Sequence, residues 1–412
     1  MFQSPSQQIV EGVAGSSLLP TSPLLPTQPV AQSKIPFNQP YITGRELEYM
    51  QAAIENGKLC GDGMFSKRCQ EWLVQQLQCR SALLTHSCTA ALEMAAILAD
   101  VQPGDEVIMP SFTFVSTANA FVLRGAVPVF VDVRSDTLNL DERLVEAAIT
   151  DRTKAIVPVH YAGVGCDMDT LRSIADEHQL CLIEDAAQGI LSEYKGKPLG
   201  SWGHLAALSF HETKNIISGE GGALLINDPA MIERAEIIRE KGTNRSQFLR
   251  GEVDKYTWVD VGSSFLPSDI LAAFLFAQLE QSRSILDQRL AVWNCYHTGL
   301  ENLELSGQAR RPIIPSDCKH NGHIYHLLVQ HPETQMALIE HLKANGIQAT
   351  FHYVPLHSSP AGQKYGRSSG SLAVTEQISD RLVRLPLSAG MTLADAERVV
   401  AIVQQFFQVR SV

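Results

Sequence analysis

The protein has 412 residues, and 45% of them are hydrophobic, which is enough to bury one large core and a second smaller one. Its net charge of −11 disfavours nucleic acid or an anionic membrane surface as the main partner, because both select for basic patches. The eight cysteines lack the paired spacing of a metal site, so we expect no metal, reduced thiols and a cytoplasmic location.

Residues 1–33 differ in composition from the rest of the chain. They are rich in Ser, Gln and Pro and hold a single charged residue, Glu11. This composition predicts a flexible tail. No basic residue precedes Lys34 and no apolar window is long enough to span a bilayer, so we expect neither a signal peptide nor a transmembrane helix.

Between residues 80 and 226, short apolar runs alternate with helical patterns. Strands that are buried on both faces and separated by helices predict a mostly parallel sheet in an α/β domain, which we place at residues 34–285. The expected strands cover 82–84, 106–109, 127–131, 155–159, 181–183, 205–210 and 223–226, and the expected helices cover 89–98, 117–123, 141–149 and 168–178.

The second half of the chain predicts a smaller α+β domain at residues 286–412. A helix over 229–241 is followed by a polar passage, 242–264, which is too long for a simple connection and is interpreted as a functional loop. One long helix from Ser268 towards Leu300 is expected to link the domains. Further strands are expected near 324–329 and 348–353, with helices at 333–344 and 393–407, and Thr392 with Asp395 predicts a capping box for the last helix.

Lys214 is held in a polar loop between two expected strands, and the glycine-rich turn Gly219–Gly222 leads into the second of them. A lysine that is partly desolvated has a lowered pKa and becomes a competent amine nucleophile towards a carbonyl. The alternative is an ordinary solvated surface charge. The rest of the chain has to supply partners before the catalytic interpretation is favoured.

Asp185 comes at the carboxyl end of an expected buried strand, and Glu184 should point to the opposite face of the sheet because side chains alternate along a strand. A carboxylate in that place needs a cationic or hydrogen-bonding partner, and a protonated pyridine nitrogen is one such partner. The alternative is an aspartate that caps a following helix.

Ser87, Cys88 and Thr89 stand where a strand should turn into a helix. Helix N-termini with small hydroxyl residues bind phosphate through free N–H groups, although a simple N-cap has the same pattern. Phe114 follows the next strand and can either stack on a flat ring or belong to the core. A phosphate cradle, a stacking aromatic ring, a carboxylate and a lysine after separate strands together predict a site for pyridoxal phosphate.

The motifs now support a resemblance to a known family. From about Ile35 to the C-terminus the sequence resembles the DegT/DnrJ/EryC1/StrS sugar aminotransferases, which implies the fold-type I, aspartate-aminotransferase-like architecture. The matching stretches are Ser87-Cys-Thr-Ala-Ala-Leu, Pro-Gly-Asp-Glu-Val-Ile-Met-Pro-Ser-Phe-Thr-Phe at 103–114, Glu184-Asp-Ala-Ala-Gln, Ser209-Phe-His-Glu-Thr-Lys-Asn and Gly219-Glu-Gly-Gly.

The resemblance implies roles for individual residues. Lys214 would bind the cofactor covalently, Asp185 would pair with the pyridine nitrogen, Gln188 would lie beside the ring hydroxyl, and Phe114 would stack on the ring. The phosphate would be held by Ser87, Cys88, Thr89 and Ser209. Two positions depart from the family pattern, because Cys88 stands where glycine is common and Leu266 stands where an asparagine of the second subunit is expected to reach the phosphate.

Three further stretches, at 58–63, 241–248 and 254–258, are most similar to the dTDP-4-amino-4,6-dideoxygalactose transaminases of surface-glycan pathways. The resemblance implies a nucleotide-linked 4-keto-6-deoxy sugar and L-glutamate as substrates, and a homodimer with shared active sites. The alternatives are another keto-sugar nucleotide or a non-catalytic regulatory relative. Family dehydratases carry histidine at the lysine position, so Lys214 argues against them. The candidate substrate-binding residues are Lys58, Tyr256, His352 and His357.

Overall fold

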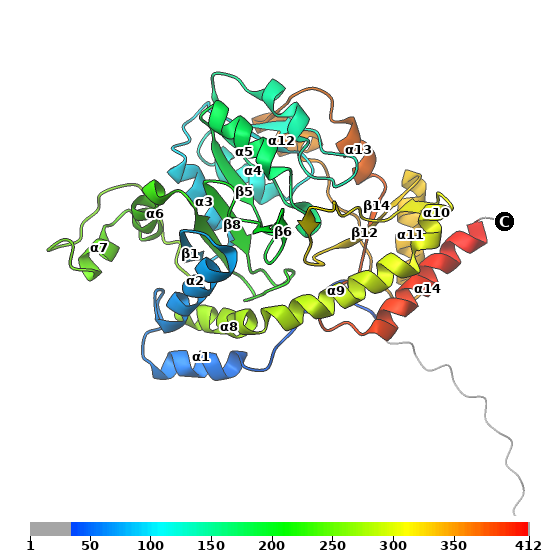
Figure 1. Ribbon diagram of the computed structural model, residues 1–412, viewed down its shortest axis with the longest axis horizontal. Coiled ribbons are helices and arrows are strands. Elements are labelled where there is room, and N and C mark those ends of the chain that lie inside the picture. The colour runs from blue at the N-terminus through cyan, green and yellow to red at the C-terminus, as the bar shows by residue number, and fades with distance from the viewer. Residues whose placement is uncertain (1–33, 411–412) are drawn as a thin grey trace, which may run out of the picture. The chain divides into compact units, whose positions relative to one another are not determined.

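The computed structural model of the protein describes residues 34–410, so the tail expected over residues 1–33 lies outside the described residues. An eight-stranded sheet has the order β1-β9-β8-β5-β4-β2-β3-β13 (Figure 1). Every pair from β8 to β13 is parallel, and β9 runs antiparallel to both β8 and β1, which confirms the mostly parallel α/β sheet. The strands are β1 Ser81–Thr85, β2 Glu106–Pro110, β3 Val127–Val131, β4 Thr153–Ile156, β5 Cys181–Asp185, β8 Leu205–Ser209, β9 Gly222–Ile226 and β13 Arg367–Ser368.

Helices cover both faces of this sheet, because alternate residues of its strands belong to different hydrophobic cores. Leu224 packs in the core that includes α3, whereas its neighbours Ala223 and Leu225 pack in the core that includes α2 and α8. These helices, with α1, α4, α5 and α6, position the strand ends described below. Their bounds are α1 Glu46–Glu55, α2 Met64–Leu77, α3 Cys88–Leu98, α4 Val115–Val122, α5 Met168–Glu177, α6 Ile232–Arg239 and α8 Asp269–Glu280.

Two of the expected helices were wrong in part. Residues 141–149 form two short 3-10 turns, Glu142–Leu144 and Glu146–Ala148, because the Asp141 carboxylate accepts from the N–H of Arg143 only two residues later, at 3.1 Å. The long helix after Ser268 is interrupted at Gln281, which separates α8 from α9 (Ser282–Gly299). In Figure 1, α8 and α9 follow one another along the lower side and lead from α1 to α14.

A second sheet, with the order β10-β12-β14, lies in the C-terminal part and is antiparallel throughout. Its core contains residues of α9, α11 and α14, and the expected Thr392 and Asp395 cap is present, with Asp395 N–H donating to Thr392 Oγ1 at 3.1 Å. The elements are β10 Ala309–Arg310, β12 Tyr325–Val329, β14 Leu382–Leu385, α10 Glu301–Leu305, α11 Pro332–Ala344, α12 Pro360–Tyr365, α13 Ala373–Ser379 and α14 Leu393–Arg410.

The strand expected at 348–353 was wrong, because this segment meets β14 at one point only, the bridge between Thr350 and Arg384. The chain then leaves the sheet edge, and the rings of His352 and Tyr353 pack against Phe112 and Tyr161 instead. The remaining elements are α7 Arg245–Leu249 and a small third sheet of β6 Glu193–Tyr194, β7 Lys197–Pro198 and β11 Cys318–Lys319, with 3-10 turns at Tyr161–Gly163, Pro229–Met231 and Leu356–Ser358.

The C-terminal part also contributes to the large sheet. β13 pairs in parallel with β3, and Arg367 in β13 forms an ion pair of 2.6 Å with the buried carboxylate of Glu106 in β2. The domain boundary predicted near residue 285 would fall in the first turn of α9. Among residues 34–410, no helix has the combination of length and apolar character that crossing a membrane requires.

Candidate active site

A cavity of about 640 Å³ lies where the carboxyl ends of the parallel strands face the C-terminal sheet. Residues after β1, β2, β5 and β8 line one side, and residues from α9 and the C-terminal sheet line the other. The structure thus brings nine of the sequence-predicted residues together, although their strands are far apart in the chain. They are Ser87, Cys88, Thr89, Phe114, Asp185, Gln188, Ser209, Lys214 and His352.

The other three predicted residues do not line the cavity of their own chain. Lys58 donates to the carbonyl oxygen of Asp62 at 2.7 Å, and Tyr256 is exposed in the polar passage after α6. His357 is bonded through Nδ1 to Ser111 Oγ at 2.7 Å and lies 3.3 Å from the Glu376 carboxylate through Nε2. Their substrate-binding role stays a prediction.

Lys214 extends from the loop between β8 and β9, which is closed by a bridge between His211 and Gly219. Burial lowers the pKa of the Lys214 amine below its usual value of 10.5, and the Arg384 guanidinium lowers it further, against the opposing effects of Cys88 and Asp185. No residue of 34–410 forms an ion pair or hydrogen bond with this amine. The lysine therefore has two properties that favour a nucleophile, a lowered pKa and no partner among residues 34–410 that holds its amine.

Asp185 ends β5 and is only 5% exposed. Its Oδ2 accepts a hydrogen bond of 2.7 Å from Thr117 Oγ1, and its Oδ1 accepts one of 3.1 Å from the N–H of Ala187. The bond to Ala187 closes a turn rather than a helix, so the helix-cap interpretation was wrong. Each oxygen keeps a lone pair for a further donor, such as a protonated ring nitrogen.

Glu184 points to the opposite face, as strand alternation predicts. Its carboxylate is fully buried and accepts from the N–H groups of Gly200, Trp202 and Gly203 at 2.7 to 2.8 Å. The fourth partner is His160 Nε2 at 2.9 Å. These bonds fix the end of β5, and so they hold the backbone from which Asp185 reaches the cavity.

The cradle after β1 is the start of α3. Ser87 is the N-cap of this helix, since its Oγ accepts from the N–H of Ala90 at 3.1 Å, and Thr89 Oγ1 lies 2.7 Å from Ser116 Oγ. The next N–H groups of the first turn have no partner within the helix, and they sit at the positive end of its dipole. An anion can be bound here together with the Thr89 hydroxyl.

Gly222 lets a strand pass directly behind this cradle. It is the first residue of β9 and pairs with Thr85 on one side and Ser209 on the other. A Cβ added at Gly222 would lie 2.5 Å from the backbone nitrogen of Cys88. Only glycine fits at this position, because the clash is with main-chain atoms of the cradle.

Phe114 is the residue before α4 and is 57% exposed, so the core interpretation of this ring was wrong. Gln188 is held from both ends. Its Oε1 accepts from the N–H of Ala162 at 2.8 Å, and its Nε2 donates to the hydroxyl of Tyr353 at 3.2 Å. Both side chains line the cavity between the cradle and the C-terminal sheet.

The model of the DegT/DnrJ/EryC1/StrS aminotransferase family matches residues 40–404. The chain belongs to this family. It is 32% identical over 378 residues to the spore coat polysaccharide biosynthesis protein SpsC of Bacillus subtilis, over 90% of this chain and 96% of that protein. Among solved structures it resembles the aminotransferase TlmJ from Streptoalloteichus hindustanus, with 28% identity, a TM-score of 0.84, and coverage of 92% of this chain and all of that one.

The family uses pyridoxal phosphate. Spr1654 from Streptococcus pneumoniae has been solved in its PLP form, with 25% identity, a TM-score of 0.82, and coverage of 90% of this chain and 99% of that one. The fold-type I architecture is therefore confirmed for this DegT/DnrJ-family protein. Its residues fit the cofactor, because the glycine-backed cradle suits a phosphate, Asp185 suits a ring nitrogen, and Lys214 has a free amine.

Of the cavity residues in the C-terminal part, sequence reasoning found His352 and missed the others. His323 is buried, and its Nδ1 lies 2.8 Å from Asn215 Oδ1. The Asn215 amide nitrogen donates to Asn321, so its oxygen must accept, and His323 carries its proton on Nδ1. Burial and the nearby Lys214 hold the pKa of His323 well below 6.5, which leaves a neutral ring with a lone pair on Nε2.

Arg384, which the sequence did not indicate, forms a second pair with the predicted residue His352. Arg384 Nη1 donates to His352 Nε2 at 3.2 Å, and His352 Nδ1 lies 3.1 Å from the hydroxyl of Tyr161. The guanidinium has no acceptor atoms, so His352 accepts at Nε2 and carries its proton on Nδ1. Burial and Arg384 lower the pKa of His352 well below 6.5, consistent with this neutral form.

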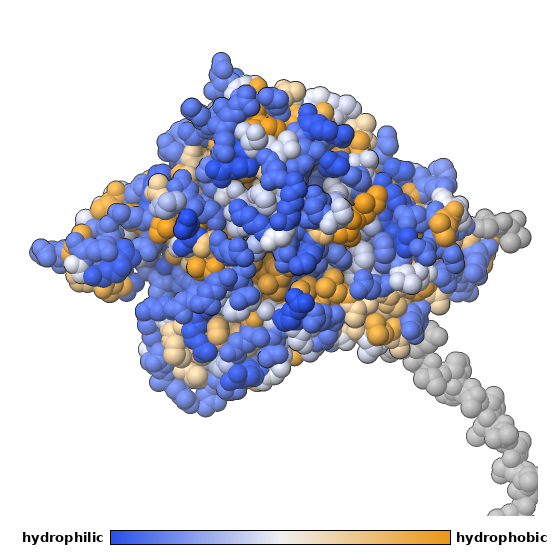
Figure 2. All heavy atoms as spheres, in the orientation of Figure 1, coloured by the Kyte–Doolittle hydropathy of each residue, from blue (hydrophilic) through white to orange (hydrophobic). Residues whose placement is uncertain are grey.

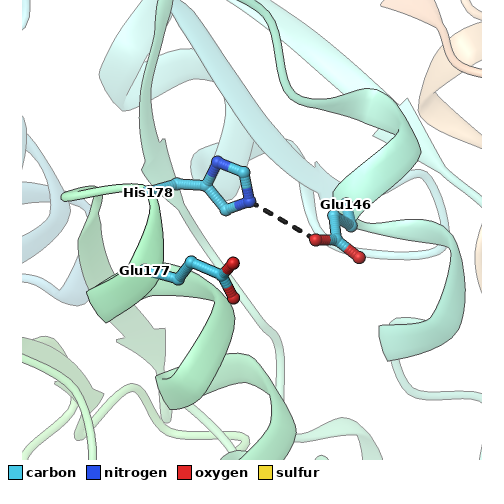
Figure 3. A group of neighbouring side chains, drawn as sticks. All are labelled: Glu146, Glu177 and His178. Atoms are coloured by element: carbon cyan, nitrogen blue, oxygen red, sulfur yellow. Dashed lines mark ion pairs between the residues drawn. The ribbon is translucent and has the colours of Figure 1, made fainter.

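One group of possible metal ligands lies outside the cavity. Glu146, Glu177 and His178 place ligand atoms within 4.8 Å of one another, and Figure 3 shows the ion pair of 3.5 Å between His178 and Glu146. All three residues are exposed at the surface around the end of α5, where such acidic groups are common without an ion. The expectation of no metal stays a prediction.

Proposed function

We propose that this protein is a pyridoxal-phosphate-dependent aminotransferase that acts in the cytoplasm on a nucleotide-linked 4-keto-6-deoxy sugar. The proposed substrate is dTDP-4-dehydro-6-deoxy-D-glucose, the donor is L-glutamate, and the product is dTDP-4-amino-4,6-dideoxygalactose for surface-glycan biosynthesis. The observation that carries this proposal is the unpaired Lys214 amine, which shares one cavity with Asp185 and a glycine-backed anion cradle. The name of SpsC supports the link to polysaccharide synthesis.

Each cavity residue has a separate role in the proposed reaction. The cofactor, when bound, supplies an aldehyde that accepts the amino group and a ring that withdraws electrons. Asp185 would hold the proton on the ring nitrogen, and the Thr117 hydroxyl keeps the carboxylate in place. Lys214 Nζ would act as the base that removes and returns the proton at the reacting substrate carbon, a role that contributes about 10²–10⁴-fold in rate. Ser87, Cys88, Thr89 and Ser209 would hold the phosphate, Phe114 would cover the ring, and Gln188 would lie beside the ring hydroxyl.

The active enzyme is proposed to be a homodimer with shared active sites. The passage after α6 exposes apolar side chains, including Phe248 and Leu249 of α7 and Trp258, which is 77% exposed. Figure 2 shows orange atoms on this segment, at the edge of the molecule where Figure 1 places α7. A large exposed apolar patch is typical of an interface. Tyr256 lies in the same passage and would complete the partner's cavity.

The activity is tested with purified protein, dTDP-4-keto-6-deoxyglucose and L-glutamate. We expect an amino sugar whose C4 configuration, measured by NMR, is that of galactose, and a visible absorbance band from the bound cofactor. Lys214→Ala should lose both the band and the product. Activity near the wild-type level in this variant would disprove the role of Lys214, and a different C4 configuration or nucleotide preference would correct the substrate.

The dimer is tested by light scattering. Trp258→Glu places a charge in the proposed interface, so we expect a mass that falls towards one chain and a parallel loss of activity. A wild-type protein that is monomeric and fully active would contradict the shared site.

A further inference from the structure

Tyr353 brings a hydroxyl to the cavity that the roles above do not use. The Gln188 amide decides what this hydroxyl can do. Gln188 Oε1 accepts from the N–H of Ala162 at 2.8 Å, so the amide turns its NH₂ group towards Tyr353, and the Tyr353 oxygen accepts from Gln188 Nε2 at 3.2 Å. The proton of Tyr353 is not used in this bond, and no acceptor for it is found among residues 34–410.

The surroundings of Tyr353 keep its hydroxyl protonated and in place. The ring packs edge-on against Phe112 and Tyr161, with centroids 5.6 and 6.3 Å away. Burial raises the pKa of the Tyr353 hydroxyl above its usual 10.0, against the opposing effects of Arg384 and of the Gln188 bond. A donor that is shielded from water and lacks an acceptor costs free energy, so this hydroxyl calls for an acceptor on a ligand.

The order of the strands tells on which side of the cavity this donor lies. The large sheet has β8 and β5 in the middle, with the cradle after β1 on one side and β4 on the other. Ala162, which anchors the amide, follows the segment that extends β4 beside β5, where Val159 and Asp185 form a parallel bridge. The cradle and the Tyr353 hydroxyl therefore lie on opposite sides of Lys214 and Asp185.

Pyridoxal phosphate carries its substituents in a matching order. The ring carbon whose aldehyde would join Lys214 has the phosphate-bearing arm on one side and the ring hydroxyl on the other. With the phosphate at the cradle and the ring nitrogen at Asp185, the ring oxygen would face the side on which Gln188 and Tyr353 lie. The oxygens of a sugar or of an amino donor are not tied to this side by the strand order.

We propose that Tyr353 donates a hydrogen bond to the ring oxygen of bound pyridoxal phosphate, as a second donor beside the remaining N–H of Gln188. The inference rests on the cofactor-dependent function proposed above. Two donors on one oxygen suit an oxygen with negative charge, because hydrogen bonds to charged groups are the stronger ones. Tyr353 would thus stabilise the deprotonated ring oxygen and weaken its hold on a proton carried by the neighbouring Lys214 nitrogen.

The test compares two cofactors that differ only in this oxygen. The apoenzyme is titrated by equilibrium dialysis with pyridoxal phosphate and with 3-deoxypyridoxal 5′-phosphate, which lacks the ring hydroxyl. Tyr353→Phe removes the donor and keeps the ring. We expect this variant to bind pyridoxal phosphate roughly tenfold more weakly than the wild type, the usual loss of one such hydrogen bond, and to bind the analogue with wild-type affinity because the acceptor is missing.

The visible band of the bound cofactor gives a second readout that does not depend on turnover. Without the Tyr353 donor, the ring oxygen holds the proton on the Lys214 nitrogen more strongly. The pH at which the band changes should therefore rise by about 1 pH unit in Tyr353→Phe, the same tenfold factor expressed as a proton affinity.

Tyr161→Phe is the matched control. It removes a hydroxyl next to Tyr353, bonded to His352 Nδ1 at 3.1 Å, but Tyr161 does not line the cavity. This variant should keep the wild-type preference between the two cofactors. Gln188→Leu is the test variant if Tyr353→Phe does not fold. It removes the other donor and the anchor of Tyr353, so its preference for pyridoxal phosphate over the analogue should fall at least roughly tenfold.

Three results would overturn the assignment. A wild-type preference between the two cofactors in Tyr353→Phe, or in Gln188→Leu where that variant is used, would show that the ring oxygen is bound elsewhere. A loss in Tyr353→Phe that is confined to kcat/KM for the amino donor or the keto-sugar nucleotide would assign the Tyr353 proton to a substrate. A wild-type apoenzyme that forms no visible band with pyridoxal phosphate would instead refute the proposed function, and this inference with it.

Discussion

Replacing Gly222 by alanine tests whether the anion cradle depends on the strand behind it. The new Cβ would lie 2.5 Å from the backbone nitrogen of Cys88 and 2.6 Å from the carbonyl oxygen of Ser87. Ordinary van der Waals contact begins at 3.4 Å, so the two backbones must separate by about 3.4 − 2.5 = 0.9 Å. No flexible side chain can absorb this shift, because both contacts are with main-chain atoms.

The magnitude follows from the size of the displacement. Overpacking of this kind destabilises a protein by about 1–3 kcal/mol. A shift of about 1 Å in a positioned binding group can cost roughly 10²-fold. We therefore expect Gly222→Ala to bind pyridoxal phosphate about a hundredfold more weakly than the wild type, with a free energy of unfolding lowered by about 1–3 kcal/mol.

The assay titrates the apoenzyme with pyridoxal phosphate and follows the visible band, and urea unfolding of the same samples gives the stability. Gly390→Ala is the control, because its added Cβ would make a single ordinary contact, 3.4 Å from Tyr41 Cδ2. Its affinity and stability should match the wild type. Wild-type cofactor affinity in Gly222→Ala would refute the argument that the close approach of β9 shapes the cradle.

Three further predictions concern buried charge. Without cofactor, Lys214→Met should be more stable than the wild type at pH 7 and should lose this advantage as the pH rises towards 10.5. The reason is that the folded wild type has a lowered Lys214 pKa, so the unfolded wild type binds more protons in that interval. A stability difference in urea unfolding that stays constant across pH would contradict this prediction. Asp185→Asn should lower kcat at least about a hundredfold, as expected for breaking a buried pair worth about 3–5 kcal/mol, whereas Thr117→Val removes one hydrogen bond of about 1 kcal/mol; equal effects would disprove the ring-nitrogen role. Glu184→Gln should lower the free energy of unfolding by about 3 kcal/mol. Each Glu184 oxygen accepts from two donors, so the NH₂ group of a glutamine faces two donors whichever way the amide is turned. A loss below about 1 kcal/mol would show that these hydrogen bonds contribute little to stability.

The large sheet and one wall of the cavity could be predicted from the sequence, for a physical reason. Strands buried on both faces are continuous apolar runs, so the polar residues that follow them stand out at once. Lys214, Asp185 and Phe114 were found in this way, and the structure places all three on one cavity. Gly222 was part of a recognisable turn signal, although the clash that requires glycine there depends on where β9 meets α3.

Of the other wall only His352 was predicted, because its residues depend on how distant segments pack. Arg384 lies in a four-residue strand, and no local pattern tells which cavity its side chain would meet. Thr117 was placed in a helix, but its bond to Asp185 joins residues 68 positions apart. The 348–353 segment has the composition of a strand, yet the rings of His352 and Tyr353 pack better against Tyr161 than along β14.

The pairing of β13 with β3 affects how the chain folds during synthesis and whether the large domain can be expressed alone. The carboxylate of Glu106 in β2 has a pKa lowered to about 2, mainly by Arg367 and also by Arg152. The main partner of this buried carboxylate is therefore a residue 261 positions later in the chain. During synthesis β13 leaves the ribosome long after β3, so the edge of β3 stays uncovered until residue 368 has emerged. Until then this edge can pair with other chains. A fragment ending near residue 285 would keep this open edge permanently, so expressing the large domain alone is expected to yield aggregates rather than a smaller enzyme.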